Sequence, residues 1–351
     1  MLTRSNAKTV VSVTIVTYNS QRFIGPCLDA LLRQSGVPFD VVVVDNNSID
    51  GTRGILARFE GRIQIIYNQR NLGFAAAQNQ AMAASCGEWV LTLNPDVFLV
   101  PGFLQEIVEA GGIDPSAGSV CGRLLSIGPD MVPPAEPRID SVGIYFTPAM
   151  RHFDRGWREP AGERFSVKEY VFGASGAAAL YRRAMIDDIS EDGNFFDPDF
   201  FAYREDADVA WRAQLLGWGC VYSPKAVAYH VRSVVAANRR SVPAVLNMHS
   251  VKNRFLMRIK NSTSGIYRRY WLPATLRDLM VVGGCLVCEP RSLPAFWHIA
   301  RCLHRALRNR RVIMARRRVG DDDLARWFRV EPASQPVPGE AVAVKCQGIP
   351  A

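Results

Sequence analysis

Carboxylates stand directly after apolar runs at two points in the first hundred residues, and such side chains can bind ligands. Asp45 ends the run Val41–Val44, and Asp96 closes the tripeptide Asn94–Asp96 after the run Trp89–Leu93. A carboxylate at the tip of a buried strand can accept hydrogen bonds from a nucleobase or ribose, or coordinate Mg²⁺ or Mn²⁺ that also holds a diphosphate. It can equally cap a turn or a helix. For each carboxylate taken alone, both interpretations stay open.

A second group of carboxylates lies among aromatic rings later in the chain. Residues 197–208 contain five acids interleaved with phenylalanine and tyrosine: Asp197, Asp199, Glu205, Asp206 and Asp208. A carboxyl group beside aromatic rings has a raised pKa, which suits a general base. The same acids can instead cap a helix over Asp206–Leu216. His230 ends a later apolar segment; a lone histidine is usually structural, but neutral imidazole also binds Mn²⁺.

The elements that would position these residues alternate between strand and helix patterns. We predict strands over Val11–Thr17, 41–44, Ile63–Tyr67 and Trp89–Leu93, and helices over Gln21–Gln34, up to Phe59 and over Ala75–Ser85. Near-continuous Val, Ile and Leu strands between helices indicate a parallel sheet covered on both faces. Ligands bind in loops at the carboxyl ends of such strands. We therefore expect Tyr18 to lie beside Asp45, where its ring could face a nucleobase.

The pattern from Leu124 to His230 is less regular. We predict loops or hairpins over Leu124–Val142, a buried strand over Val171–Arg183 and an extended segment over Cys220–His230. The chain has no G-x-G-x-x-G after its first strand and no G-x-x-x-x-G-K-[ST]. Both absences count against a dinucleotide oxidoreductase and a P-loop nucleotidase.

The composition is that of a globular protein with one large α/β domain and extensions, or with two domains. Hydrophobic residues make up 48% of the 351 residues, which excludes wholesale disorder. No run of 18 apolar residues occurs, and residues 1–20 lack the ordered regions of a signal peptide. We therefore expect a cytoplasmic protein.

Six segments in order resemble the family-two inverting glycosyltransferases of the GT-A fold, and within them the bacterial rhamnosyltransferase-like branch. They are TYNS, VVVVDNNSIDGT, NLGFAAAQN, LNPDV, FFAYREDADVAWRAQLLGW and YH, over roughly residues 10–232. The resemblance implies an α/β fold with a mostly parallel Rossmann-like sheet, helices on both faces and a C-terminal helical extension. We expect a catalytic domain over 1–232, with a nucleotide-sugar half at about 10–124 and an acceptor half at about 125–232. A basic, mostly helical extension over 233–330 and a flexible tail over 331–351 would follow.

The resemblance also assigns roles to the residues of these segments. Tyr18 and Asp45 correspond to positions that bind the nucleobase, with Asp45 on the pyrimidine N3–H. The residues that correspond to positions near the sugar diphosphate are Asn71, Gly73 and Asn79. The complete set expected at the nucleotide sugar is Thr17, Tyr18, Asn19, Asp45, Asn71, Gly73, Asn79, Asn94 and Asp96. Asp96 and His230 correspond to ligands of a divalent cation, Mg²⁺ or Mn²⁺. Asn94 stands where the D-x-D motif has its first Asp and brings no charge, so strict metal dependence is open.

The catalytic step that the resemblance implies inverts the anomeric centre. Asp206 corresponds to the base that takes the proton from an acceptor hydroxyl, and Glu205 lies beside it in the same motif. We assign Trp211 and Arg212, later in the motif, to the acceptor side. Asp206 could instead be only a helix cap, in which case its loss would affect folding rather than rate.

The donor and acceptor follow from the branch that the chain resembles. We expect transfer of L-rhamnose from dTDP-rhamnose to a lipid-linked cell-envelope or polysaccharide acceptor. Three alternatives remain: the same fold with a UDP-hexose donor, a nucleotidyltransferase, and a non-catalytic protein that binds a nucleotide sugar. A nucleotidyltransferase usually has a Gly-rich loop and a basic residue after its first strand, which TYNSQRF does not match.

The C-terminal region is strongly basic. Residues 231–330 contain 21 Lys and Arg against 5 Asp and Glu, a net charge of +16, whereas the remaining residues carry −7. An Arg-rich amphipathic helix with Trp and Leu on its other face suits an anionic membrane surface. The alternatives are nucleic-acid binding, for which no motif occurs, and a helix packed on the catalytic domain with a solvated basic face. A lipid-linked acceptor favours the membrane, so we expect peripheral association with the inner face of the cytoplasmic membrane and no nucleic-acid partner.

Overall fold

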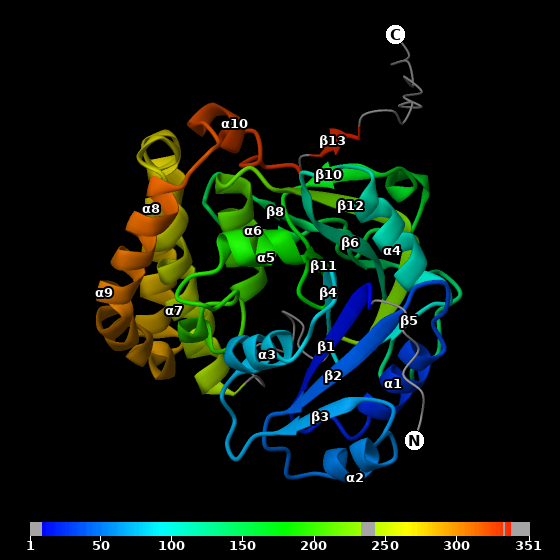
Figure 1. Cartoon of the computed structure of the whole chain (residues 1–351). Coiled ribbons are helices and arrows are strands. Elements are labelled where there is room, and N and C mark those ends of the chain that lie inside the picture. The colour runs from blue at the N-terminus through cyan, green and yellow to red at the C-terminus, as the bar shows by residue number, and fades with distance from the viewer. Residues whose placement is uncertain (1–8, 233–242, 333, 338–351) are drawn as a thin grey trace.

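A central sheet with helices on both sides organises the molecule (Figure 1). The computed structural model describes residues 9–232, 243–332 and 334–337. The strands of the main sheet lie in the order β13-β10-β12-β6-β11-β4-β1-β2-β3, with β5 paired to β12 and β7 paired to β6. A separate hairpin is formed by β8 (Ile144–Phe146) and β9 (His152–Asp154).

The N-terminal half of the sheet is parallel, as the apolar runs predict. β1 (Val11–Thr17) pairs with β2 (Phe39–Asp45) and with β4 (Trp89–Leu93), and β2 pairs with β3 (Gln64–Tyr67). Every residue of β1 and β4 is buried, because helices cover both faces of these strands. The predicted bounds of β1 and β4 are confirmed to the residue.

The C-terminal half makes the sheet mixed rather than mostly parallel. β6 (Ala117–Ser126) and β12 (Gly219–His230) are parallel, but β11 (Ala178–Arg182) runs antiparallel between β4 and β6. The single strand predicted over Val171–Arg183 is divided: β10 (Glu169–Val171) lies beyond β12, and only β11 enters the centre of the sheet. Gly173 and Gly176 fall in the break, where small residues interrupt a strand.

The remaining elements complete this frame. The short strands are β5 (Val97–Leu99), β7 (Ile139–Ser141) and β13 (Gln335–Pro336). The helices are α1 (Ile24–Leu32), α2 (Thr52–Ala57), α3 (Phe74–Ala83), α4 (Phe103–Gly112), α5 (Arg183–Ile189), α6 (Glu205–Leu215), α7 (Ala244–Asn261), α8 (Ser264–Val287), α9 (Pro294–Ala315) and α10 (Asp321–Ala325). Within Leu124–Val142, expected as loops or hairpins, β6 continues to Ser126 and pairs with β7.

Among the described residues, the two largest hydrophobic cores lie on the two faces of the sheet. Alternate residues of β11 enter different cores: Ala179 and Tyr181 face one, and Ala178 and Leu180 face the other. The first core also contains residues of the C-terminal helices and of the segment after α10. The ring of Phe328 lies 5.2 Å from that of Trp211 in α6.

The C-terminal helices α7, α8 and α9 form a layer at one side of the molecule, next to α6 (Figure 1). The domain boundary at residue 232 stays a prediction, and α7 to α9 contribute to the same core as α6. In the predicted tail over 331–351, β13 pairs with β10, and residues 338–351 lie outside the described ranges.

Candidate active site

A cleft of about 590 Å³ opens at the carboxyl ends of β1 and β4 and reaches the start of α6. Eight of the residues predicted for the site line it: Tyr18, Asn71, Gly73, Asn94, Asp96, Glu205, Asp206 and His230. These residues come from five separate segments of the chain. The topology therefore brings together side chains that the sequence relates only through the order of its motifs.

The loop before α3 is held in one shape by hydrogen bonds. The Asn46 amide donates to Asn71 Oδ1 at 2.9 Å and to the Gly73 carbonyl at 3.2 Å, and Gly73 N donates to Asn71 Oδ1 at 2.8 Å. Gly73 has φ +84°, and a Cβ there would lie 2.5 Å from Phe201 Cδ2. A side chain larger than hydrogen would displace Phe201, so the glycine lets this loop approach the segment before α6.

Three residues expected at the nucleotide lie beside the cleft rather than in its lining. Asp45 is fully buried and pairs with Arg53 Nε at 2.6 Å. Thr17 is fully buried as well. Asn19 Oδ1 accepts a hydrogen bond from Ile49 N at 2.9 Å, which joins the loop after β1 to the loop after β2. Tyr18, by contrast, lines the cleft and is 47% exposed.

Asn79, Trp211 and Arg212 do not line the cleft either. The Asn79 side chain donates to the Phe196 carbonyl at 2.7 Å and accepts from Phe196 N at 3.0 Å, so it ties α3 to the acidic segment. Trp211 is fully buried in the core. Arg212 is 1% exposed and pairs with Asp208 at 2.9 Å.

Strand pairing brings Asp96 and His230 together. Val97 in β5 lies opposite His230 in β12, so His230 Nε2 comes within 3.5 Å of Asp96 Oδ1. The other ring nitrogen, Nδ1, lies 2.7 Å from Asp140 Oδ2. Although burial opposes it, hydrogen bonds to Asp140 and Asp96 raise the pKa of His230 to about 9.

Asp96 and His230 offer a carboxylate oxygen and an imidazole nitrogen, two kinds of donor atom that bind divalent cations. A carboxylate on the second ring nitrogen of a histidine is the usual outer partner at metal sites, because it fixes the tautomer and ring orientation. The described part of the chain contains no group of three or more His, Cys, Asp or Glu side chains arranged to hold a metal. An ion held by Asp96 and His230 would therefore complete its shell with phosphate oxygens and water.

Sequence reasoning missed the charged residues around this pair. Asp140 in β7 is 1% exposed and pairs with Arg232 Nε at 2.7 Å, and Arg232 also pairs with Asp154 at 2.7 Å. Arg151, Arg204 and Arg232 all line the cleft and can offset the charge of a diphosphate. Arg232 follows His230 by two residues, so the sequence could have indicated it as a neighbour of the site. Asp140 stands in no recognisable motif.

Glu205 and Asp206 form a carboxyl pair at the N-terminus of α6. Asp206 Oδ2 accepts a hydrogen bond from Gly176 N at 3.0 Å. Burial raises the pKa of both carboxyls, that of Glu205 to about 8, and the Asp206 charge adds to the shift at Glu205. Glu205 Oε2 is buried and has no hydrogen-bond partner among the described residues. A carboxyl pair of this kind can accept a proton at neutral pH.

Similar proteins point to one family. Residues 12–190 match the family described as Glycosyl transferase family 2. The N-acetylglucosaminyl-diphospho-decaprenol L-rhamnosyltransferase of Mycobacterium tuberculosis is 29% identical over 241 residues, which cover 63% of this chain and 76% of that protein.

Two solved structures share the fold. S. aureus TarS 1–349 with UDP-GlcNAc has a TM-score of 0.53 at 17% identity, covering 88% of this chain and 91% of that one. The mannosyltransferase PcManGT from Pyrobaculum calidifontis, with GDP-Man and Mn²⁺, has a TM-score of 0.51 at 17% identity, covering 89% and 86%. The resemblance seen in the six sequence segments is confirmed: the chain is a glycosyltransferase with a GT-A fold and belongs to glycosyl transferase family 2.

Proposed function

We propose that this glycosyltransferase moves L-rhamnose from dTDP-rhamnose to a lipid-linked saccharide of the cell envelope, with inversion at the anomeric carbon. One observation carries the proposal: the Glu205–Asp206 pair and the Asp96–His230 pair line the same cleft. The donor and acceptor are supported by the mycobacterial relative, whose name states rhamnosyl transfer to a diphospho-decaprenol-linked sugar.

The nucleotide sugar would bind along the loops after β1, β2 and β4. Tyr18 would face the base, and Asn71, Gly73 and Asn94 would contact the sugar diphosphate, because all four line the cleft. Asp45 would reach the base only if its ion pair with Arg53 is shared or rearranged. Thr17 would support the surrounding loops from its buried position, and Asn19 and Asn79 would do so through their hydrogen bonds.

Asp96 and His230 would hold a Mg²⁺ or Mn²⁺ ion. The fit rests on a carboxylate and an imidazole nitrogen facing each other, with Asp140 orienting the ring. A bound divalent cation stabilises the negative charge that develops on a leaving diphosphate.

The chain's own residues would perform the proton transfer. Asp206 accepts the proton of the acceptor hydroxyl. The oxygen of that hydroxyl attacks the anomeric carbon while the bond from that carbon to the diphosphate breaks. The Gly176 N–H holds one oxygen of Asp206 in place at 3.0 Å. Arg151, Arg204 and Arg232 offset charge on the diphosphate within the cleft.

A donor panel and one substitution test this proposal. Release of nucleoside diphosphate should be fastest with dTDP-rhamnose and should require a lipid-linked saccharide acceptor. Asp206→Asn should fold and bind donor while turnover falls about 10²-fold, the usual scale for loss of a general base. More than a third of wild-type turnover in Asp206→Asn would refute the role of Asp206.

A UDP-hexose donor is the second candidate. It is favoured by the UDP-GlcNAc complex of TarS, which shares this fold. Faster turnover with a UDP-hexose than with dTDP-rhamnose in the same panel would replace the rhamnose proposal. A nucleotidyltransferase and a non-catalytic binding protein lack support, since the family is one of glycosyltransferases.

We also propose that the face of α8 and α9 meets an anionic membrane surface from the cytoplasmic side. Large apolar side chains are exposed there, including Trp271 (53%), Leu279 (63%) and Trp297 (65%). Within the described ranges, no single helix is long and apolar enough to cross a bilayer. Ser264–Val287 and Pro290–Ala315, which are bent by 113° relative to each other, would be long and apolar enough only when taken together. Exposed apolar rings among arginines favour binding at the headgroup level.

A further inference from the structure

The segment between the 3₁₀ turn Pro198–Phe200 and α6 has an unusual backbone. Phe201, Tyr203 and Arg204 have φ values of +63°, +70° and +71°. Non-glycine residues rarely adopt such angles, and they persist only where surrounding contacts fix them. This segment leads directly into Glu205 and Asp206, so its conformation sets where the carboxyl pair begins.

One side chain of α7 makes several of the contacts that fix the segment. The Asn253 side-chain nitrogen Nδ2 lies 2.8 Å from the Phe200 carbonyl, 2.9 Å from that of Ala202 and 2.7 Å from that of Tyr203. Three carbonyl acceptors around one atom identify it as the NH₂ group rather than the amide oxygen. Asn253 is fully buried, so water cannot replace these hydrogen bonds.

Neighbouring residues on the same face of α7 support the segment. The His249 ring stacks on Phe201 with a centroid distance of 4.7 Å and an interplanar angle of 12°. Arg204 Nε donates to the Ser250 carbonyl at 3.0 Å. His249, Ser250 and Asn253 are spaced as neighbours on one helical face, so α7 presents one continuous surface to the segment.

The other side of the segment meets the donor side of the cleft. Ala75 N donates to the Phe201 carbonyl at 3.2 Å, and the Phe201 ring fills the space that a side chain at Gly73 would need. Residues 201–204 therefore lie between α7 and the loop proposed to bind the nucleotide sugar.

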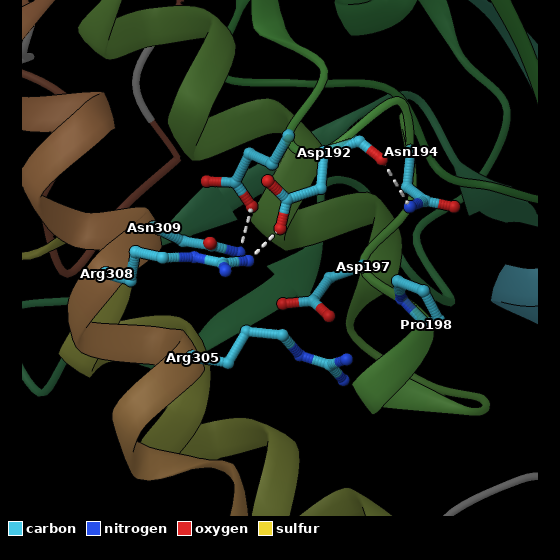
Figure 2. A pocket seen from close by; sticks show the side chains of 8 residues that line it. Asp192, Asn194, Asp197, Pro198, Arg305, Arg308 and Asn309 are labelled. Carbon is cyan, nitrogen blue, oxygen red and sulfur yellow. Dashed lines mark hydrogen bonds and ion pairs between the residues drawn. The ribbon is translucent and has the colours of Figure 1, made fainter.

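A second cavity, of about 290 Å³, lies between α9 and residues 191–198, which precede this segment (Figure 2). Arg308 pairs with Asp192, and Asn309 donates to Glu191 at 3.1 Å. Asp197 pairs with Lys260 of α7 at 2.8 Å. The charged groups here hold one another, so we interpret this cavity as part of a brace and not as a ligand site.

We infer that Asn253 is a positioning residue for sugar transfer: its amide holds residues 200–203 in the conformation that directs Asp206 into the cleft. The inference rests on the proposed function, in which Asp206 is the base. Neither the family match, which ends at residue 190, nor the sequence motifs include α7.

The test compares Asn253→Leu with a matched control. Leucine has a similar volume and cannot donate a hydrogen bond. Asn309→Leu removes another buried amide, one that contacts Glu191 and not residues 200–203. We expect kcat of Asn253→Leu to fall by at least about tenfold, since displacement of a catalytic group by ~1 Å can cost about 10²-fold. Asn309→Leu should keep kcat within about twofold when both variants are assayed below their melting temperatures.

The decisive measurement repeats Asn253→Leu in an Asp206→Asn background. If Asn253 acts through Asp206, the second substitution should lower the remaining kcat less than about twofold, because residues that act as one unit are not additive. An equal loss in both backgrounds would overturn the inference and leave Asn253 a merely structural residue. Full activity of Asp206→Asn alone would instead refute the proposed base. Should Asn253→Leu not fold, Asn253→Gln keeps the donor but displaces it, and the same comparison of backgrounds applies.

Discussion

Removal of the buried ammonium of Lys260 should strongly destabilise this protein. Its side chain is 0% exposed and pairs with Asp197 at 2.8 Å, Glu191 at 2.9 Å and Asp208 at 3.2 Å. Although burial opposes the shift, the Lys260 charge holds the pKa of Asp197 below its ordinary value. Lys260→Met would keep the length of the side chain and leave three carboxylates to share the Arg212 guanidinium.

The magnitude follows from the uncompensated charge. Breaking a buried ion pair by removing one partner costs about 3–5 kcal/mol. A chain of 351 residues unfolds with an entropy of about 0.7 kcal/mol per kelvin, so the melting temperature should fall by about 4–7 °C. Lys225→Met is the matched control, because Lys225 is exposed on β12 and its loss should shift the melting temperature by less than about 1 °C.

Thermal unfolding at pH 7 and one fixed scan rate measures this effect. Adding Asp197→Asn to Lys260→Met should recover part of the loss, because it removes one of the unpaired charges while the Asn side-chain oxygen can still accept from Asp199 N. A shift no larger than that of Lys225→Met would show that the cluster contributes little, as an exposed pair would. Failure of Asp197→Asn to recover any stability would show that packing, and not charge, explains the loss.

Three further predictions concern metal, pH and the membrane. Excess chelator should abolish sugar transfer, and Mg²⁺ or Mn²⁺ should restore it. Asp96→Ala should weaken donor binding, measured by calorimetry with metal present. Full activity in excess chelator would point to a metal-independent site. Because burial raises the pKa of Glu205 from 4.5 to about 8, the folded state binds more protons than the unfolded one between these values, so stability should fall as pH rises through that window. Glu205→Gln should show a smaller drop in melting temperature from pH 6 to pH 8 than the wild type, and an equal drop would contradict the assignment. Arg301 and Arg311 are exposed on α9, and the double variant Arg301→Gln with Arg311→Gln should bind anionic vesicles about 30-fold more weakly, at ~1 kcal/mol per arginine. The double variant Arg62→Gln with Arg70→Gln serves as the control. Equal binding by the two double variants would refute attachment through α9.

The parallel strands were predictable because their signal is local. Val11–Thr17 and Trp89–Leu93 are covered on both faces, so every position is buried, most side chains are apolar and the polar ones are small hydroxyl residues. The strand predicted over Val171–Arg183 lacked such a signal. Its residues up to Tyr181 are uncharged, and only the pairing of β11 with β4 and β6 decides that Gly173 and Gly176 lie in the loop before β11, where Gly176 is beside Asp206.

The residues around His230 could not be found in the same way. Asp140 reaches His230 because β7 pairs with β6 and β6 pairs with β12, which are two long-range pairings with no mark in the local sequence. Trp211 and Arg212 show the opposite problem. They belong to a recognisable motif, but Ala207–Leu215 is buried on every side of α6, so helical periodicity does not tell which residues face the cleft.

The charge asymmetry of the sequence has two separate physical origins. Part of the basic excess after residue 231 neutralises the acidic body: Arg316 and Arg318 pair with Asp188. Those arginines hold the C-terminal end of α9 against the catalytic half. This is what we expect if the basic helix packs on the catalytic domain rather than on a membrane. The exposed apolar residues Leu279 and Trp297 lie on α8 and α9 outside these ion pairs. A net charge of +16 thus overstates what a membrane would meet, and attachment should depend on apolar contact together with the arginines that do not hold the fold.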